Sequence, residues 1–232
     1  VPFPQGEATP ETRFQGHSAT TGDAVPTQSF PLALWPDGSI RWLLARFMVP
    51  AGETLNYTIE LSNGVGRVPL ERPAQKPKTA QDEPLQGRIG GTSYRFSPDP
   101  AGWVQQQTST GRTQNVSLVL KGPEGAAYPV AETFTWQLLE QGDVCTRVQG
   151  EGRFSAGQDA RTFNARLTLT LYPTGLAAIR VRLHNPHRAR HPGGLWDLGD
   201  PGSLYFKSLT LKLTTDSPAS PWLQPVHDQP DC

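Results

Sequence analysis

The chain has 232 residues, which is enough for one large all-β domain or two smaller domains. Lysine plus arginine and aspartate plus glutamate both total 21, so the formal net charge is zero and the basic excess that nucleic-acid binding requires is missing. Only 36% of the residues are hydrophobic, and no stretch approaches the roughly 20 apolar residues of a transmembrane helix. We therefore expect neither a nucleic acid nor a membrane as a partner.

Glycine and proline each occur 23 times without a collagen-like period, which predicts many turns between short strands. The chain begins at Val1 without an initiator methionine and ends at Cys232 just after a proline-rich stretch. We therefore expect it to be a piece of a longer protein. Two cysteines, Cys145 and Cys232, are too few to indicate a redox compartment.

Apolar and polar residues alternate along much of the chain, as in strands with one buried face. This alternation predicts strands at 32–35, 40–49, 54–61, 132–139, 144–149, 163–171, 177–183 and 209–214. Short turn sequences at 36–38, 141–143 and 173–175 separate neighbouring strands, so these neighbours should pair antiparallel. No window of 11 or more residues has a helical stripe, and only short helical turns are allowed, at 101–107.

These patterns predict an all-β fold, which is a single antiparallel domain with long loops, either barrel-like or a strongly twisted β-sandwich. Residues 68–84 are dense in proline, lysine, glutamine and alanine, which is typical of a long surface loop or a linker between two half-domains. We expect one domain over 1–215, followed by a proline-rich linker over 216–232 that leads to a missing C-terminal domain.

The densest group of polar residues lies at 184–200, between two strand patterns, and should form a long loop. Its candidate carbohydrate-binding residues are Arg188, His191, Trp196, Asp197 and Asp200. An aromatic ring can pack on the apolar face of a sugar while charged groups hydrogen-bond the hydroxyls. A structural role fits equally, because Asp200 begins a turn sequence and Trp196 could plug the end of a barrel. Both interpretations stay open.

The same loop does not make a convincing catalytic or metal centre. Its histidines and aspartates match no compact metal motif. Asp197 and Asp200 are too close in sequence to flank a glycosidic bond from one loop. His191 with Arg188 or Arg190 could supply the base and the cation of a lyase, but a second contributing element is missing. We assign no catalytic residue, no metal and no cofactor.

Residues 35–42 read W-P-D-G-S-I-R-W. Asp37 and Gly38 predict a tight hairpin turn, and Trp35 and Trp42 flank it where they can reach one another across the two strands. We interpret this element as a structural hairpin with an aromatic pair in or near the core. Arg41 should make a local contact and not bind a uronate.

The opening V-P-F-P-Q-G, the element V-P-T-Q at 25–28 and above all L-W-P-D-G-S-I-R-W at 34–42 resemble the N-terminal β domain of the exo-rhamnogalacturonan lyase and YetA-like proteins, a RIFT-type barrel. Residues 191–203 are similar to a loop of the same domain. In that family the β domain precedes a large helical toroid, to which lyase chemistry is assigned.

The resemblance therefore implies a non-catalytic domain of a polysaccharide lyase-like protein. This domain would pack against and support a helical catalytic domain and could wall one side of the substrate cleft, with an acidic polysaccharide as a further partner. We favour a secreted or periplasmic location. The alternatives are a self-sufficient carbohydrate-binding module and a small lyase or glycoside hydrolase centred on the loop at 184–200.

Overall fold

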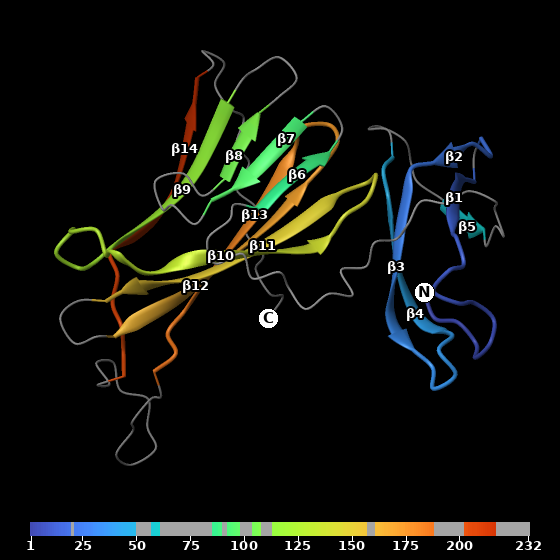
Figure 1. The fold of residues 1–232 in the computed structure, drawn as a ribbon, viewed down its shortest axis with the longest axis horizontal. Coiled ribbons are helices and arrows are strands. Elements are labelled where there is room, and N and C mark those ends of the chain that lie inside the picture. Colours follow the sequence, from blue (N-terminus) through green and yellow to red (C-terminus); the bar gives the residue numbers. More distant parts are fainter. Residues whose placement is uncertain are drawn as a thin grey trace.

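A computed structural model describes residues 1–19, 21–49, 57–60, 85–89, 92–97, 104–107, 113–156, 161–187 and 202–216. All regular elements in these ranges are β-strands, and every strand pair is antiparallel. The described strands form four open sheets, none of which closes into a barrel (Figure 1). The all-β prediction is confirmed. Within the same ranges, no helix is long and apolar enough to cross a membrane.

The N-terminal part, by which we mean the described residues between 1 and 60, contains two small sheets (Figure 1). One has the strand order β2-β1-β5, and the other is the hairpin β3-β4. The strands are β1 (Gln15–Ser18), β2 (Ala24–Val25), β3 (Thr27–Leu34), β4 (Ile40–Phe47) and β5 (Tyr57–Glu60). The start of the chain runs along β4, because Val1 and Leu43 exchange backbone hydrogen bonds. Together these segments bury a small cluster of Phe3, Ala8, Phe14, Ile40 and Leu43.

The described residues between 85 and 216 form two sheets that share one core, and we call this unit the sandwich (Figure 1). The five-stranded sheet, in the order β14-β9-β8-β7-β6, consists of β6 (Leu85–Ile89), β7 (Thr92–Phe96), β8 (Val104–Gln107), β9 (Thr113–Lys121) and β14 (Ser208–Thr215). The four-stranded sheet is the meander β10 (Val130–Glu140), β11 (Thr146–Ser155), β12 (Thr162–Leu171) and β13 (Ala177–His184). The chain enters this meander after β9 and returns for β14, which pairs with β9.

The sandwich core is built from the alternating residues that the sequence indicates. On β12, Ala165 and Leu167 are buried, whereas Arg166 between them is exposed. Phe96 of β7 and Trp136 of β10 meet across the two sheets, with 5.2 Å between their ring centroids. One face of each sheet therefore faces the core and the other faces outward, as in most antiparallel sheets.

Two glycines allow β11 to run past Gln149, where the sequence predicts its end. A Cβ atom at Gly150 would lie 2.6 Å from the ring of Trp136, and one at Gly152 would lie 2.5 Å from the ring of Phe134. Both rings come from the neighbouring strand β10 and pack directly on the glycine backbone. Glycine inside a strand here marks such a close approach and does not break the strand.

Other strand boundaries also differ from those that the sequence predicts. Residues 104–107, where the sequence allows helical turns, form β8 because they are paired on both sides, with β7 and with β9. The hairpin strand β3 begins five residues earlier than the predicted start at 32. Residues 54–56 and 68–84 lie outside the described residues. The single domain over 1–215 and the linker over 216–232 stay predictions.

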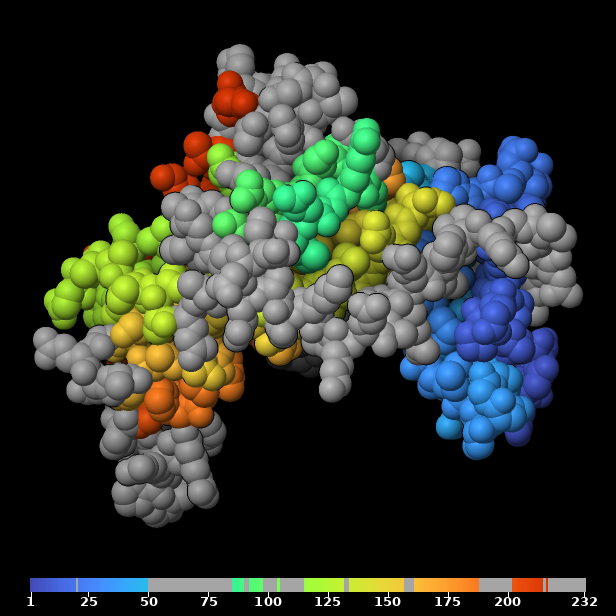
Figure 2. Space-filling model, in the orientation of Figure 1, coloured from blue at the N-terminus to red at the C-terminus, as the bar shows by residue number. Residues whose placement is uncertain are grey.

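A polar joint connects the N-terminal part to the sandwich, where the end of β10 and the following turn lie against β3 and β4 (Figures 1 and 2). Gln28 of β3 is buried and donates its Nε2–H to Glu140 Oε1 at 2.6 Å. Its Oε1 accepts the backbone N–H groups of Val144 and Cys145, at 3.1 and 2.9 Å. The amide group of Gln28 thus replaces strand pairing as the link between the two units. Gly142 lets it approach, since a Cβ atom there would collide with the Gln28 side chain.

Two arginines complete the joint around the buried carboxylate of Glu140. Arg46 Nε donates to Glu140 Oε1 at 3.1 Å, and Arg147 Nη1 lies 3.5 Å from Glu140 Oε2. The second contact is an ion pair without hydrogen-bond geometry, since Oε2 has no hydrogen bond within the described residues. The side chains of both arginines are about one-third exposed, so their charges are partly screened by water.

We expect Gln28→Ala to lower the free energy of unfolding by about 1–3 kcal/mol, because it leaves buried polar groups without partners. Urea unfolding followed by tryptophan fluorescence measures this loss. Gln86→Ala is the matched control, because Gln86 is exposed on β6 and should tolerate the same truncation. Equal stability of the two variants would contradict a structural role for the joint.

The thiol of Cys145 reports on the same joint. Cys145 is a fully buried free cysteine, and burial, followed by the nearby charge of Glu140, raises the pKa of its thiol. In a Cys232→Ser background we expect slow alkylation of the native protein and clearly faster alkylation after Gln28→Ala. A rate that does not change with Gln28→Ala would show that the turn at Cys145 does not depend on the Gln28 amide.

Candidate functional site

Residues 188–201, which include most of the predicted loop at 184–200 and its candidates Arg188, His191, Trp196, Asp197 and Asp200, lie outside the described residues. Their roles stay predictions. The segments on either side of residues 188–201 are described, and Asn185 Nδ2 donates to the carbonyl oxygen of Gly202 at 2.7 Å. The loop therefore begins and ends at neighbouring points of the sandwich. Within the ranges that the structure describes, no three His, Cys, Asp or Glu side chains lie close enough to hold a metal ion.

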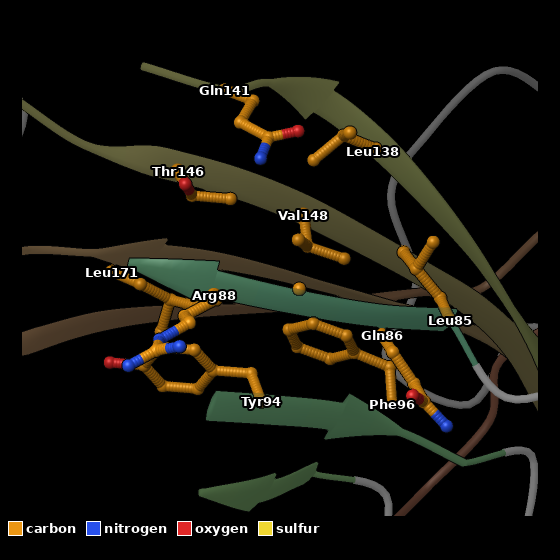
Figure 3. A pocket seen from close by; sticks show the side chains of 11 residues that line it. Leu85, Gln86, Arg88, Tyr94, Phe96, Leu138, Gln141, Thr146, Val148 and Leu171 are labelled. Carbon is orange, nitrogen blue, oxygen red and sulfur yellow. The ribbon is translucent and has the colours of Figure 1, made fainter. Parts of the chain in front are cut away.

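A small cavity beside β6, lined by residues of both sheets, is too small for a sugar (Figure 3). Its volume is about 20 Å³, which is room for roughly one water molecule. The hydroxyl groups of Tyr94 and Thr146, two of the lining residues, have no hydrogen-bond partner within the described part of the chain. Burial also raises the pKa of Tyr94, which stays a neutral phenol. The cavity fits one ordered water and no ligand.

The turn of the hairpin β3-β4 has the geometry that its sequence predicts. Gly38 has a φ of 86°, a conformation that favours glycine, and its N–H donates to the Trp35 carbonyl at 2.9 Å. Asp37 Oδ1 accepts the N–H and the hydroxyl of Ser39, at 3.0 and 2.6 Å. The Ser39 hydroxyl in turn accepts the N–H of Gly6 at 2.9 Å. Asp37 and Gly38 are therefore structural, and they fasten the start of the chain to the hairpin turn.

The predicted tryptophan pair across this hairpin is wrong. The strand pairing is irregular on both sides of Ala33, and Trp42 lies opposite Ala33 with 45% of its surface exposed. Trp35 is partly buried and donates its indole N–H to the carbonyl oxygen of Phe3 at 3.0 Å. The Arg41 guanidinium lies 4.8 Å from the centroid of the Trp35 ring, so Arg41 makes the local contact expected for it.

The hairpin and the chain start leave four large apolar side chains in solvent, and we call them the hairpin surface: Val1, Leu32, Leu34 and Trp42. Leu32 is 58% exposed, although the regular alternation of β3 would allow it to be buried. Exposed apolar residues that gather on one element are typical of a surface that contacts another protein unit. The sequence indicates that Leu32, Leu34 and Trp42 are apolar and lie in strands, but not that their side chains are left exposed.

The N-terminal part, with its hairpin turn and the chain start paired along β4, therefore forms a small all-β unit. Residues 1–62, which contain it, match the family model of the PcRGLX-like N-terminal RIFT barrel domain. The match confirms the resemblance that the sequence of the hairpin predicts, and it covers the hairpin surface. No curated protein and no solved structure matches the chain.

The carboxyl group of Asp37 should make the hairpin turn sensitive to acid. Its hydrogen bonds with the hydroxyl and then the N–H of Ser39 hold its pKa below the ordinary value of 3.8. Because a lowered pKa favours the folded state only when the group is ionised, this contribution is full above 3.8 and disappears as the pH falls through the lowered pKa. We expect Asp37→Ala to lower the melting temperature at neutral pH, and the difference from the wild type to shrink well below pH 3.8. A difference independent of pH would contradict this role.

Proposed function

We propose that the chain is the non-catalytic N-terminal β domain of a polysaccharide lyase-like, carbohydrate-active protein, and that it packs against and supports a helical catalytic domain of that protein. The observation that carries the proposal is the hairpin surface, which lies inside the segment that matches the N-terminal RIFT barrel model. The family description calls the matched segment an N-terminal domain, and the partner that we propose for the hairpin surface is a helical catalytic domain of the full-length protein, outside residues 1–232.

The hairpin surface leaves apolar area in contact with water. Covering an apolar surface releases roughly 25 cal/mol for each Å² removed from water. The exposed fractions of Leu32, Leu34 and Trp42 lie between 39% and 58%, so each of these side chains has area left to bury. Among the described residues, the cluster below the hairpin contains five buried side chains, a small core that gives the N-terminal part little stability of its own. Docking of a second domain would bury more apolar surface and so add the stability that this small core does not supply.

The polar joint, which lies at the end of the hairpin away from the turn, also supports the proposal. Gln28 and Arg46 lie on β3 and β4 and bond to Glu140, so the hairpin is attached to the sandwich by side chains near one of its ends. This attachment orients the hairpin while its apolar side chains stay uncovered by the described residues of the sandwich. The chain would thus offer a preoriented apolar surface to its catalytic partner.

The double substitution Leu32→Ser with Trp42→Ser tests the proposal when it is made both in this chain alone and in the full-length protein. In the isolated chain the effect should be small, because substitutions of exposed residues usually change stability by about 0.5 kcal/mol or less. In the full-length protein the pair should lower the melting temperature of the catalytic domain, because an interface is lost. Thermal unfolding with a separate readout of activity measures both.

Leu176→Ser provides the matched control, because Leu176 is 61% exposed in the turn between β12 and β13 and lies outside the hairpin surface. We expect it to be neutral in both proteins. Equal effects of the double substitution in the isolated chain and in the full-length protein would show that the hairpin surface does not contact a following domain.

A further inference from the structure

The outward face of the four-stranded sheet carries a polar groove, which no sequence motif indicates. The groove has a volume of about 550 Å³, which is within the usual range for ligand sites. Charged and amide side chains line it, among them Glu151, Arg153, Asn164, Arg166, Arg182 and His184. They come from β11, β12 and β13, which lie side by side in Figure 1.

The strand register sets these residues in two rows across the sheet. Glu151 is opposite Arg166, and Arg166 is opposite Arg182. In the next row Arg153 is opposite Asn164, and Asn164 is opposite His184. Residues opposite one another on neighbouring antiparallel strands share a face, with about 4.5–5.5 Å between their Cβ atoms. The rows therefore form one continuous polar surface, because the intervening residues of β12 point into the core.

Charge is unbalanced along the first row. Glu151 Oε1 forms an ion pair with Arg166 Nη2 at 2.6 Å. Arg182 is exposed on the other side of Arg166 and has no ion-pair partner within the described part of the chain. Like charges directly opposite one another on a sheet destabilise it. An anion that lies between Arg166 and Arg182 would remove this cost.

The second row supplies groups suited to hydroxyls. Asn164 is partly exposed and lines the groove with a side-chain amide, which can both donate and accept hydrogen bonds. His184 is exposed beside it at the end of β13. None of the exposed large apolar side chains of the described residues lines the groove. The groove therefore lacks the apolar contacts through which an acidic peptide is usually anchored.

We propose that this groove binds an anionic polysaccharide, with a carboxylate or sulfate held between Arg166 and Arg182 and sugar hydroxyls hydrogen-bonded by the row of Asn164 and His184. Guanidinium groups match the planar, two-pronged geometry of a carboxylate. A nucleic acid is a poorer candidate, because the formal net charge of the chain is zero. This binding role goes beyond the docking of the hairpin surface and does not depend on it.

Binding of the intact chain to polygalacturonate, dextran sulfate and uncharged dextran, measured by affinity electrophoresis or calorimetry, tests the proposal. The first two polymers separate carboxylate from sulfate recognition, and the third should not bind. We expect Arg182→Gln to weaken binding of the preferred polyanion at least tenfold, which is about 1.4 kcal/mol. Its melting temperature should not fall, because Arg182 is exposed, forms no ion pair within the described residues and loses only a like-charge contact with Arg166.

Lys212→Gln is the matched control, because it removes one positive charge from an exposed position on β14 of the other sheet. It should leave the affinity unchanged. The proposal is overturned if neither polyanion binds, if Lys212→Gln weakens binding as much as Arg182→Gln does, or if duplex DNA binds as tightly as the preferred polysaccharide. None of these results affects the test of the hairpin surface, which uses other residues and another measurement.

Discussion

The amide group of Gln28 is the constraint on which the arrangement of the molecule depends. It donates to Glu140 and accepts two backbone N–H groups from the turn after β10, all of them buried. Buried polar groups lose much free energy when they are left unpaired, so the joint strongly favours one relative position of the hairpin and the sandwich. Since Gln28 carries both a donor and an acceptor, one side chain serves a carboxylate and a turn at the same time.

The joint matters because the two hydrophobic clusters share no residue. The sandwich fills its own core with side chains from nine strands, whereas the cluster below the hairpin is small. Apolar burial alone would therefore not specify how the hairpin sits on the sandwich. Directional hydrogen bonds do so, and the partly exposed arginines around Glu140 offset the cost of burying its charge.

Two surfaces of opposite character follow from this arrangement. The hairpin surface is apolar and lies in the segment that matches the N-terminal RIFT barrel model, and it suits contact with another domain. The groove on β11 to β13 is polar and rich in arginine, and it suits an anionic sugar chain. The two proposals place support and recognition on separate parts of one chain, so each can fail without the other.

The sequence by itself determined the features that depend on neighbouring residues. The alternation in 163–171 predicted the buried face of β12, the Pro-Asp-Gly turn predicted the hairpin, and the residues around that turn predicted the family match over 1–62. Only the tertiary structure decided the features that join distant residues. Gln28 and Glu140 are 112 positions apart, and the row of Glu151, Arg166 and Arg182 exists only because three strands pair in one register. Local patterns specify which face of a strand is apolar, but pairing across the fold sets which polar groups meet, and no local pattern contains that information.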